Sequence, residues 1–198
     1  MTVVYDVTST LSGTDDGGGD ANFNTRNVLS PSVLGAASGK KCQLEFRFGT
    51  GCPTEALSIT SVYFGQGDTT DPTVDSNFNG NQVQVKFGGS GTMGGGAAKV
   101  MVSDILTLGE NWDKTKCYVA AFHVDGASGM SWSTSAIGGF AGPQTYVDNG
   151  GAGNPDTSAN TIPGNNMHSH NANTVFFLEK ITITDAVPLF GGSRRVDV

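Results

Sequence analysis

The chain has 198 residues and a formal net charge of −7 at pH 7. Its 11 lysines and arginines never form a run longer than two, so it lacks the clustered cations that bind phosphate groups, and we expect neither nucleic acid nor a membrane as a partner. Glycine contributes 29 residues while hydrophobic residues make up only 37%, which indicates many tight turns.

Alternating apolar and polar residues predict a series of short strands. The clearest alternation runs through residues 40–51, where Cys42, Leu44, Phe46 and Phe48 fall on every second position. A strand of this kind has one buried face and one solvated face, as in antiparallel sheets. Further strand-like runs occupy residues 2–9, 55–65, 81–89, 98–104, 116–124, 144–148 and 173–185.

Helical patterns are nearly absent, and the best candidate is a turn within residues 103–113 that Gly109 would end. Asp125-Gly126 lies between two strand-like runs and predicts a hairpin turn. Long loops rich in glycine and asparagine are expected at residues 12–24, 65–80 and 138–173. Loops of this length tend to be functional or disordered.

These patterns predict an all-β fold, an antiparallel, jelly-roll-like β-sandwich with long Gly/Asn-rich loops. We expect residues 1–187 to form a single domain and residues 188–198 to form a C-terminal tail that packs on a neighbouring subunit. No apolar run is long enough to cross a membrane. The opening MTVVYDVTST lacks the basic and apolar parts of a signal peptide, so we expect synthesis in a host cytoplasm without secretion.

An ordered series of glycine-led motifs lies within residues 42–126. It comprises LEFRFGTG (44–51), LSIT (57–60), QVQVKFGGSGT (82–92), VMVSD (100–104) and CYVAAFHVDG (117–126). The series resembles the β-sandwich accessory domain found beside SGNH/GDSL-type hydrolase domains, and it is similar to related modules in phage structural proteins. The chain departs from that pattern at the Ser-Asp corner, where Asp104 is followed by Ile105 instead of proline. The resemblance implies a non-catalytic sandwich module and carries over no catalytic residue.

Motifs of nucleophilic catalysis are missing from the sequence. It contains no Gly-Asp-Ser-Leu and no G-x-S-x-G elbow, and its histidines, His123, His168 and His170, have no recognisable nucleophile beside them. We therefore expect no enzyme activity. A diverged esterase-type hydrolase is the least favoured reading.

Two groups of residues could hold a metal ion. His168 and His170 share one face of an extended chain, and a third ligand would have to come from elsewhere, such as another copy. Asp15, Asp16 and Asp20 gather carboxylates in a flexible turn, as calcium-binding loops do, and residues 68–75 hold a similar set. Ordinary polar loops are the alternative in each case. Paired imidazoles suit zinc or iron, but we expect no resident cofactor, with calcium as the possible exception.

The three cysteines, Cys42, Cys52 and Cys117, have no metal-binding spacing. Buried free thiols are one reading. The other is a single disulfide, with Cys42 and Cys117 as the possible pair.

Sugar binding would require exposed aromatic rings, because the C–H faces of sugars stack on π-systems. Trp132, Trp112, Tyr146 and Tyr63 are the candidates, and burial in the core or in an interface is the alternative for each.

The function favoured by the sequence is that of a phage virion structural protein, namely a head decoration or cement protein or a neck or tail accessory component. Such a protein would be a homo-oligomer located in the virion, with other copies and other virion proteins as partners. The alternative is a carbohydrate-binding host-recognition module with glycan partners.

Overall fold

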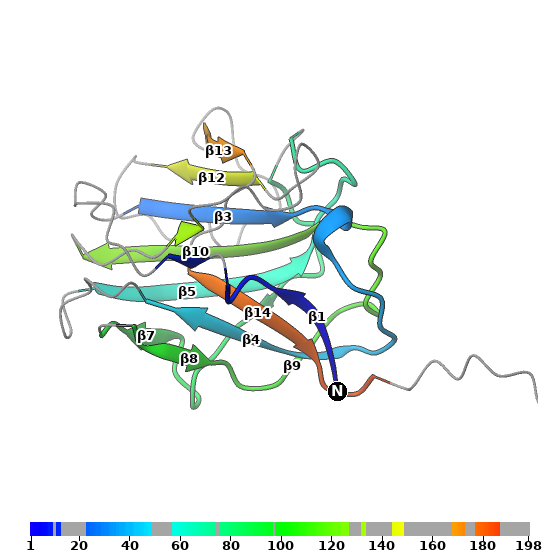
Figure 1. Ribbon diagram of the computed structural model, residues 1–198, viewed down its shortest axis with the longest axis horizontal. Helices are drawn as coiled ribbons and strands as arrows, with labels where there is room; N and C mark the ends of the chain where they lie inside the picture. The colour runs from blue at the N-terminus through cyan, green and yellow to red at the C-terminus, as the bar shows by residue number, and fades with distance from the viewer. Residues whose placement is uncertain are drawn as a thin grey trace, which may run out of the picture.

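The computed structural model describes residues 1–9, 11–12, 23–48, 57–73, 76–96, 98–126, 132–133, 144–148, 168–172 and 177–186. Within these ranges the chain is all β, apart from one short 3-10 helix, η1 (Pro31–Val33). Two antiparallel sheets pack together as a β-sandwich, which confirms the predicted fold class (Figure 1). The jelly-roll form of the sandwich stays a prediction.

The first sheet has five strands in the order β1-β14-β4-β8, with β9 also pairing with β4. All of its pairings are antiparallel. Its strands are β1 (Thr2–Asp6), β4 (Lys41–Arg47), β8 (Val100–Val102), β9 (Leu106–Thr107) and β14 (Leu178–Ile183).

The second sheet has seven strands in the order β13-β12-β3-β10-β5-β6, with β7 also pairing with β5. Its strands are β3 (Phe23–Leu29), β5 (Leu57–Gln66), β6 (Val83–Gln84), β7 (Thr92–Gly94), β10 (Tyr118–Gly126), β12 (Gln144–Asp148) and β13 (His168–Ala172). A separate two-stranded ribbon joins β2 (Leu11–Ser12) to β11 (Trp132–Ser133).

The main core lies between the two sheets. The apolar positions of β4 and the residue after it, Cys42, Leu44, Phe46 and Phe48, are all 0% exposed, which confirms the burial predicted from their alternation. Phe46 meets Phe122 of β10 edge-to-face at 5.8 Å between ring centroids. The buried face of β4 therefore packs against the opposite sheet.

The second sheet is also apolar on part of its outer face. Val28, Cys117, Val119 and Ala121 form a smaller buried cluster there together with Phe78. The chain after β5 folds back over this face, with Gly67 bridging to Phe78 and donating its N–H to the Cys117 carbonyl at 2.9 Å. This central part of the sheet is thus covered on both faces.

Several local expectations are wrong. Residues 103–113 contain no helical turn, and they supply β9 to the first sheet instead. Asp125-Gly126 does not form a turn, because it ends β10 and pairs there with Ser58 and Leu57. Strands β3 and β13 lie where no strand was expected.

No helix among the described residues is long and apolar enough to span a membrane.

Candidate functional site

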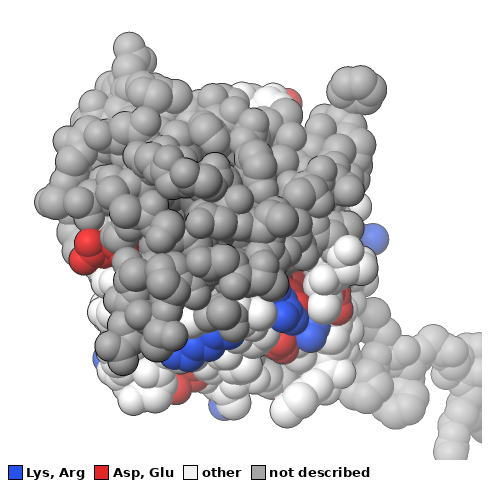
Figure 2. All heavy atoms as spheres, turned by 60° about the vertical axis from the view of Figure 1, so that its left-hand side comes forward, with Lys and Arg blue, Asp and Glu red and all other residues white. Residues whose placement is uncertain are grey.

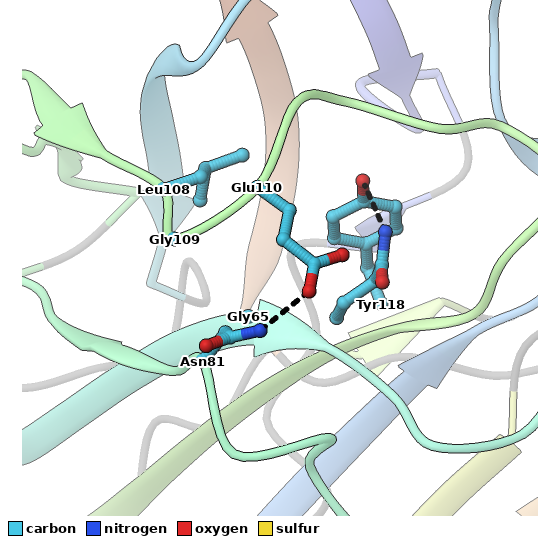
Figure 3. A pocket seen from close by; sticks show the side chains of 7 residues that line it. Gly65, Asn81, Leu108, Gly109, Glu110 and Tyr118 are labelled. Carbon is cyan, nitrogen blue, oxygen red and sulfur yellow. Dashed lines mark hydrogen bonds between the residues drawn. The ribbon is translucent and has the colours of Figure 1, made fainter.

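A small hollow opens at the end of the sandwich between β5, Asn81, Leu108–Glu110 and Tyr118 (Figure 3). Its free volume of about 10 Å³ holds about one water molecule. Asn81 Nδ2 donates to Glu110 Oε1 at 2.6 Å across its mouth, as the dashed line in Figure 3 shows. The Asn81–Glu110 hydrogen bond joins two loops, and the hollow beneath it is too small for an organic ligand.

Tyr118 anchors this end of the sandwich. Its hydroxyl accepts the backbone N–H of Asp113 at 2.9 Å, and its ring stacks on Trp112 with centroids 4.0 Å apart. Burial raises the pKa of Tyr118, so the phenol stays protonated at neutral pH. These contacts give Tyr118 a structural role.

A wider depression of about 430 Å³ is lined by Lys40, Lys41, Asp185 and their neighbours. The Asp185 carboxylate accepts the backbone N–H of Lys41 at 2.9 Å and that of Lys40 at 3.1 Å. These two bonds lower the pKa of Asp185, and the bond from Lys41 has the larger effect. The Asp185 carboxylate therefore has a structural role, because it joins the end of β14 to the start of β4.

The Gly-Gly-Ser and Ser-Asp motifs lie against each other. Gly88 and Gly89 have φ values of 60° and 84° and form a tight turn between Phe87 and Ser90. Asp104 accepts the N–H of Gly88 at 2.9 Å on one carboxylate oxygen and that of Gly89 at 2.8 Å on the other. The two motifs therefore have a structural role, in which the Asp104 carboxylate stabilises the Gly88-Gly89 turn.

His123 lies on β10 and is partly buried. Its Nδ1 is 2.9 Å from Asn24 Oδ1, and because a carbonyl oxygen only accepts, Nδ1 carries the proton. Burial lowers the pKa of His123, which keeps the imidazole neutral at neutral pH. The side chain that it contacts here is an amide, not a nucleophile.

Among the aromatic sugar-binding candidates, the expectation for Trp112 is wrong. Its side chain is only 4% exposed, and its indole N–H donates to the Gly35 carbonyl at 2.9 Å. Tyr63 is half-buried against the outer cluster of the second sheet. The backbone of Trp132 pairs with Ser12 in the two-stranded ribbon, and that of Tyr146 pairs with Arg26 and Ser169 in the second sheet.

The metal candidates lie partly outside the described residues. His168 pairs with Val147 through the backbone of β13, and His170 lies at the irregularity of the same pairing. Asp15, Asp16 and Asp20 lie outside the described residues. Of the carboxylates in residues 68–75, Asp71 accepts the N–H and hydroxyl of Thr73 in its own turn. The described ranges contain no cluster of three or more candidate ligands.

The possible disulfide between Cys42 and Cys117 is wrong. Both thiols are buried and free. They belong to different cores, since Cys42 faces the main core between the sheets while Cys117 faces the outer cluster of the second sheet.

Exposed apolar side chains gather at one end of the first sheet. Val100 is 37% exposed and Val102 46% exposed on β8, and Ile105, 56% exposed, follows before β9. We call these three residues the β8 edge. The neighbouring hollow of about 190 Å³ runs from Ile105 to Val83 and Gln84 of β6. This surface was not among the predicted sites, although Val100-Met101-Val102 breaks the alternation expected of a half-solvated strand.

Charges on the described surface are mixed in sign. On the described part of the face drawn in Figure 2, basic and acidic side chains lie close to one another. Two ion pairs lie on the first sheet. Arg47 Nη2 is 2.7 Å from Glu179 Oε1, and Lys180 Nζ is 3.2 Å from Glu45 Oε2.

A scan against known protein families finds no match, and a search of curated proteins finds none either.

Proposed function

We propose that this chain is a structural component of a bacteriophage particle that acts through contacts with other subunits and performs no chemistry. The assignment covers a head decoration or cement protein and a neck or tail accessory component. The observation that carries the proposal is the β8 edge, where Val100 and Val102 are exposed on the last strand of the first sheet and Ile105 is exposed just after it. Exposed apolar groups of this kind are typical of protein–protein contacts.

Three further points support the proposal. The motif series resembles modules of phage structural proteins, and its Gly-Gly-Ser and Ser-Asp parts hold the sandwich together through Asp104. The hollow shown in Figure 3 has room for about one water molecule. On the described part of the face drawn in Figure 2, side chains of both signs lie close together, which suits neither a polyanion nor a polycation as a partner there.

The test is mass analysis of particles purified from the phage that encodes the chain, with and without reductant. We expect the chain at a fixed copy number per particle, and we expect it to stay with the particles through a density gradient. Absence from purified particles, or loss on a single wash at moderate salt, would overturn the assignment.

A further inference from the structure

We propose that the β8 edge binds the same edge of a second copy, so that two first sheets join into one continuous sheet across a twofold axis at Met101. This inference deepens the proposed function by naming the partner and the surface. It rests on that function for the setting in which the contact forms.

The pairing register of β8 shows which of its backbone groups face away from the sheet. Val100, Met101 and Val102 pair with Arg47, Phe46 and Glu45 in turn. The flanking bonds, Phe48 N–H to the Lys99 carbonyl at 2.9 Å and Ser103 N–H to the Leu44 carbonyl at 2.8 Å, mark the hydrogen-bonded pairs of the same register. Bonded and non-bonded pairs alternate in an antiparallel ladder. Val100 and Val102 are therefore in non-bonded pairs, and their N–H and C=O groups point away from β4.

That direction is the open end of the first sheet at Val100 and Val102, and the open stretch ends there, because the Asp104 N–H already donates outward to the Lys86 carbonyl at 2.7 Å. In the strand order of the described residues, β8 is terminal, with a pairing only to β4. The side chains of Val100 and Val102 are also exposed, whereas Met101 packs against the main core. The edge thus offers both backbone hydrogen bonds and apolar contact to another strand.

The charged side chains next to β8 and opposite it on β4 are bound within the chain's own sandwich. Edge strands tend to carry a free lysine, an inward charge or a proline. Here the Lys99 ammonium is bound to the Gly94 carbonyl at 2.9 Å. The charged residues of β4 opposite the valines are paired within their own sheet, Arg47 with Glu179 and Glu45 with Lys180. Residues 98–107 contain no proline.

The edge is complementary to itself. Val100-Met101-Val102 reads the same in both directions, so an antiparallel copy with Met101 on the axis places Val100 opposite Val102 of the second copy, and the reverse. Each of these pairs exchanges both of its N–H···O=C bonds, and the valines of the two copies meet on one face. Such a twofold contact uses the same patch on both subunits, which is the commonest form of homo-oligomer.

The strand is short, so we expect a weak dimer in solution. Stable interfaces bury on the order of 1,000 Å² or more, and three residues of strand fall below this unless Ile105 and the neighbouring hollow also take part. On a particle, the high local concentration of subunits would strengthen the same contact.

The first test measures self-association of the full chain by sedimentation over a concentration series. We expect a monomer–dimer equilibrium that Val102→Lys weakens about tenfold or more, because the change puts charge on the edge. Val3→Lys is the matched control, since Val3 is an exposed valine, 52% accessible, on the strand at the other end of the same sheet. It should leave association unchanged.

The second test probes the register. The double variant Val100→Glu, Val102→Lys places opposite charges across the proposed twofold contact and should recover dimerisation that Val102→Lys loses. A monomer at all concentrations, equal effects of the Val102→Lys and Val3→Lys changes, or no recovery in the double variant would each overturn the inference. So would a strictly monomeric chain that needs Val102 only to stay on particles, because the edge would then bind another virion protein.

The outcomes for the inference and for the proposed function are separate. A chain that dimerises through β8 but is absent from purified particles would leave the inference standing and remove the virion assignment. A chain that stays on particles but is a monomer at all concentrations would do the reverse.

Discussion

At the scale of single residues, Gly39 occupies a position that only glycine fits. Its φ is +155°, and a Cβ built there would lie against the Asp185 carboxylate and 2.8 Å from Ile183 Cγ2. Its carbonyl accepts the N–H of Trp112 at 2.7 Å, so the backbone cannot shift freely. Gly39 therefore lets the end of β14, the start of β4 and the Trp112 loop meet closely.

We expect Gly39→Ala to lower the free energy of unfolding by about 1–3 kcal/mol, because it adds backbone strain and a steric clash. Gly94→Ala is the control, since a Cβ there meets nothing within 4 Å. Urea unfolding followed by tryptophan fluorescence measures both. Equal midpoints for the two variants would contradict this view of Gly39.

The cysteines provide a prediction that depends on pH. Burial, with a smaller contribution from Asp185, raises the pKa of the Cys42 thiol from 9.0 to about 12. Because the folded pKa is the higher one, the thiol's contribution to stability is complete below pH 9 and is lost as the pH rises toward 12. We expect Cys42→Ala to lose less stability than the wild-type chain between pH 8 and pH 11.

Urea unfolding of the two proteins at each pH measures this difference. Alkylation of the native chain at pH 8 should also leave Cys42 unmodified, while alkylation in urea without reductant should modify both Cys42 and Cys117. A peptide linking these two residues by a disulfide would show that the buried thiols are not free.

At the scale of elements, Asp104 holds the Gly88-Gly89 turn to the segment between β8 and β9. One carboxylate oxygen accepts each glycine N–H. An asparagine has only one acceptor oxygen, and its NH₂ would face the other donor. We expect Asp104→Asn to cost about 1–2 kcal/mol of unfolding free energy in urea.

Asp71→Asn is the matched control for this change. Both bonds that Asp71 accepts from Thr73 reach the same oxygen, Oδ1, which asparagine retains. It should therefore cost less than about 0.5 kcal/mol. A loss of stability as large as that of the Asp104 variant would mean that charge, not the two-oxygen geometry, is what matters at both turns.

At the scale of the whole molecule, the main core joins both sheets into one unit. Its buried residues come from strands between β1 and β14, and Phe46 lies near its centre, at 5.8 Å from the rings of both Phe87 and Phe122. A core shared in this way should unfold cooperatively.

We expect Phe46→Ala to lower the unfolding free energy by about 3–5 kcal/mol and to leave one transition. The exposed Val3→Ala should change it by less than about 0.5 kcal/mol. Circular dichroism and fluorescence should give coincident urea curves. Two separate transitions would show that the sheets fold independently.

The sequence by itself determined the sandwich and the burial of β4. Strict alternation places Leu44 and Phe46 on one face, and a face so apolar must be covered by a second layer. The near absence of helix followed from the same patterns. These features are local, because a side chain two residues along a strand always returns to the same face.

Only the tertiary structure decided the role of β3. Its central residues, Asn24, Thr25, Arg26 and Asn27, are at most 1% exposed, although no strand was expected at these polar positions. Neighbouring strands on both sides and packing on both faces provide partners, such as the Ser76 carbonyl 2.8 Å from Arg26 Nη1 and the Phe78 ring 4.9 Å from its guanidinium. Polar groups can be buried when such partners exist, and these lie about 50 residues away in the chain.

The exposure of the candidate binding residues was also decided by the tertiary structure. Trp112 looked suited to an exposed platform, but the Gly35 carbonyl and the Tyr118 ring hold it inside. Val100 and Val102 looked like ordinary strand residues, but β8 is the last strand of its sheet and leaves them exposed. Exposure depends on which strands become neighbours, and distant parts of the chain decide that.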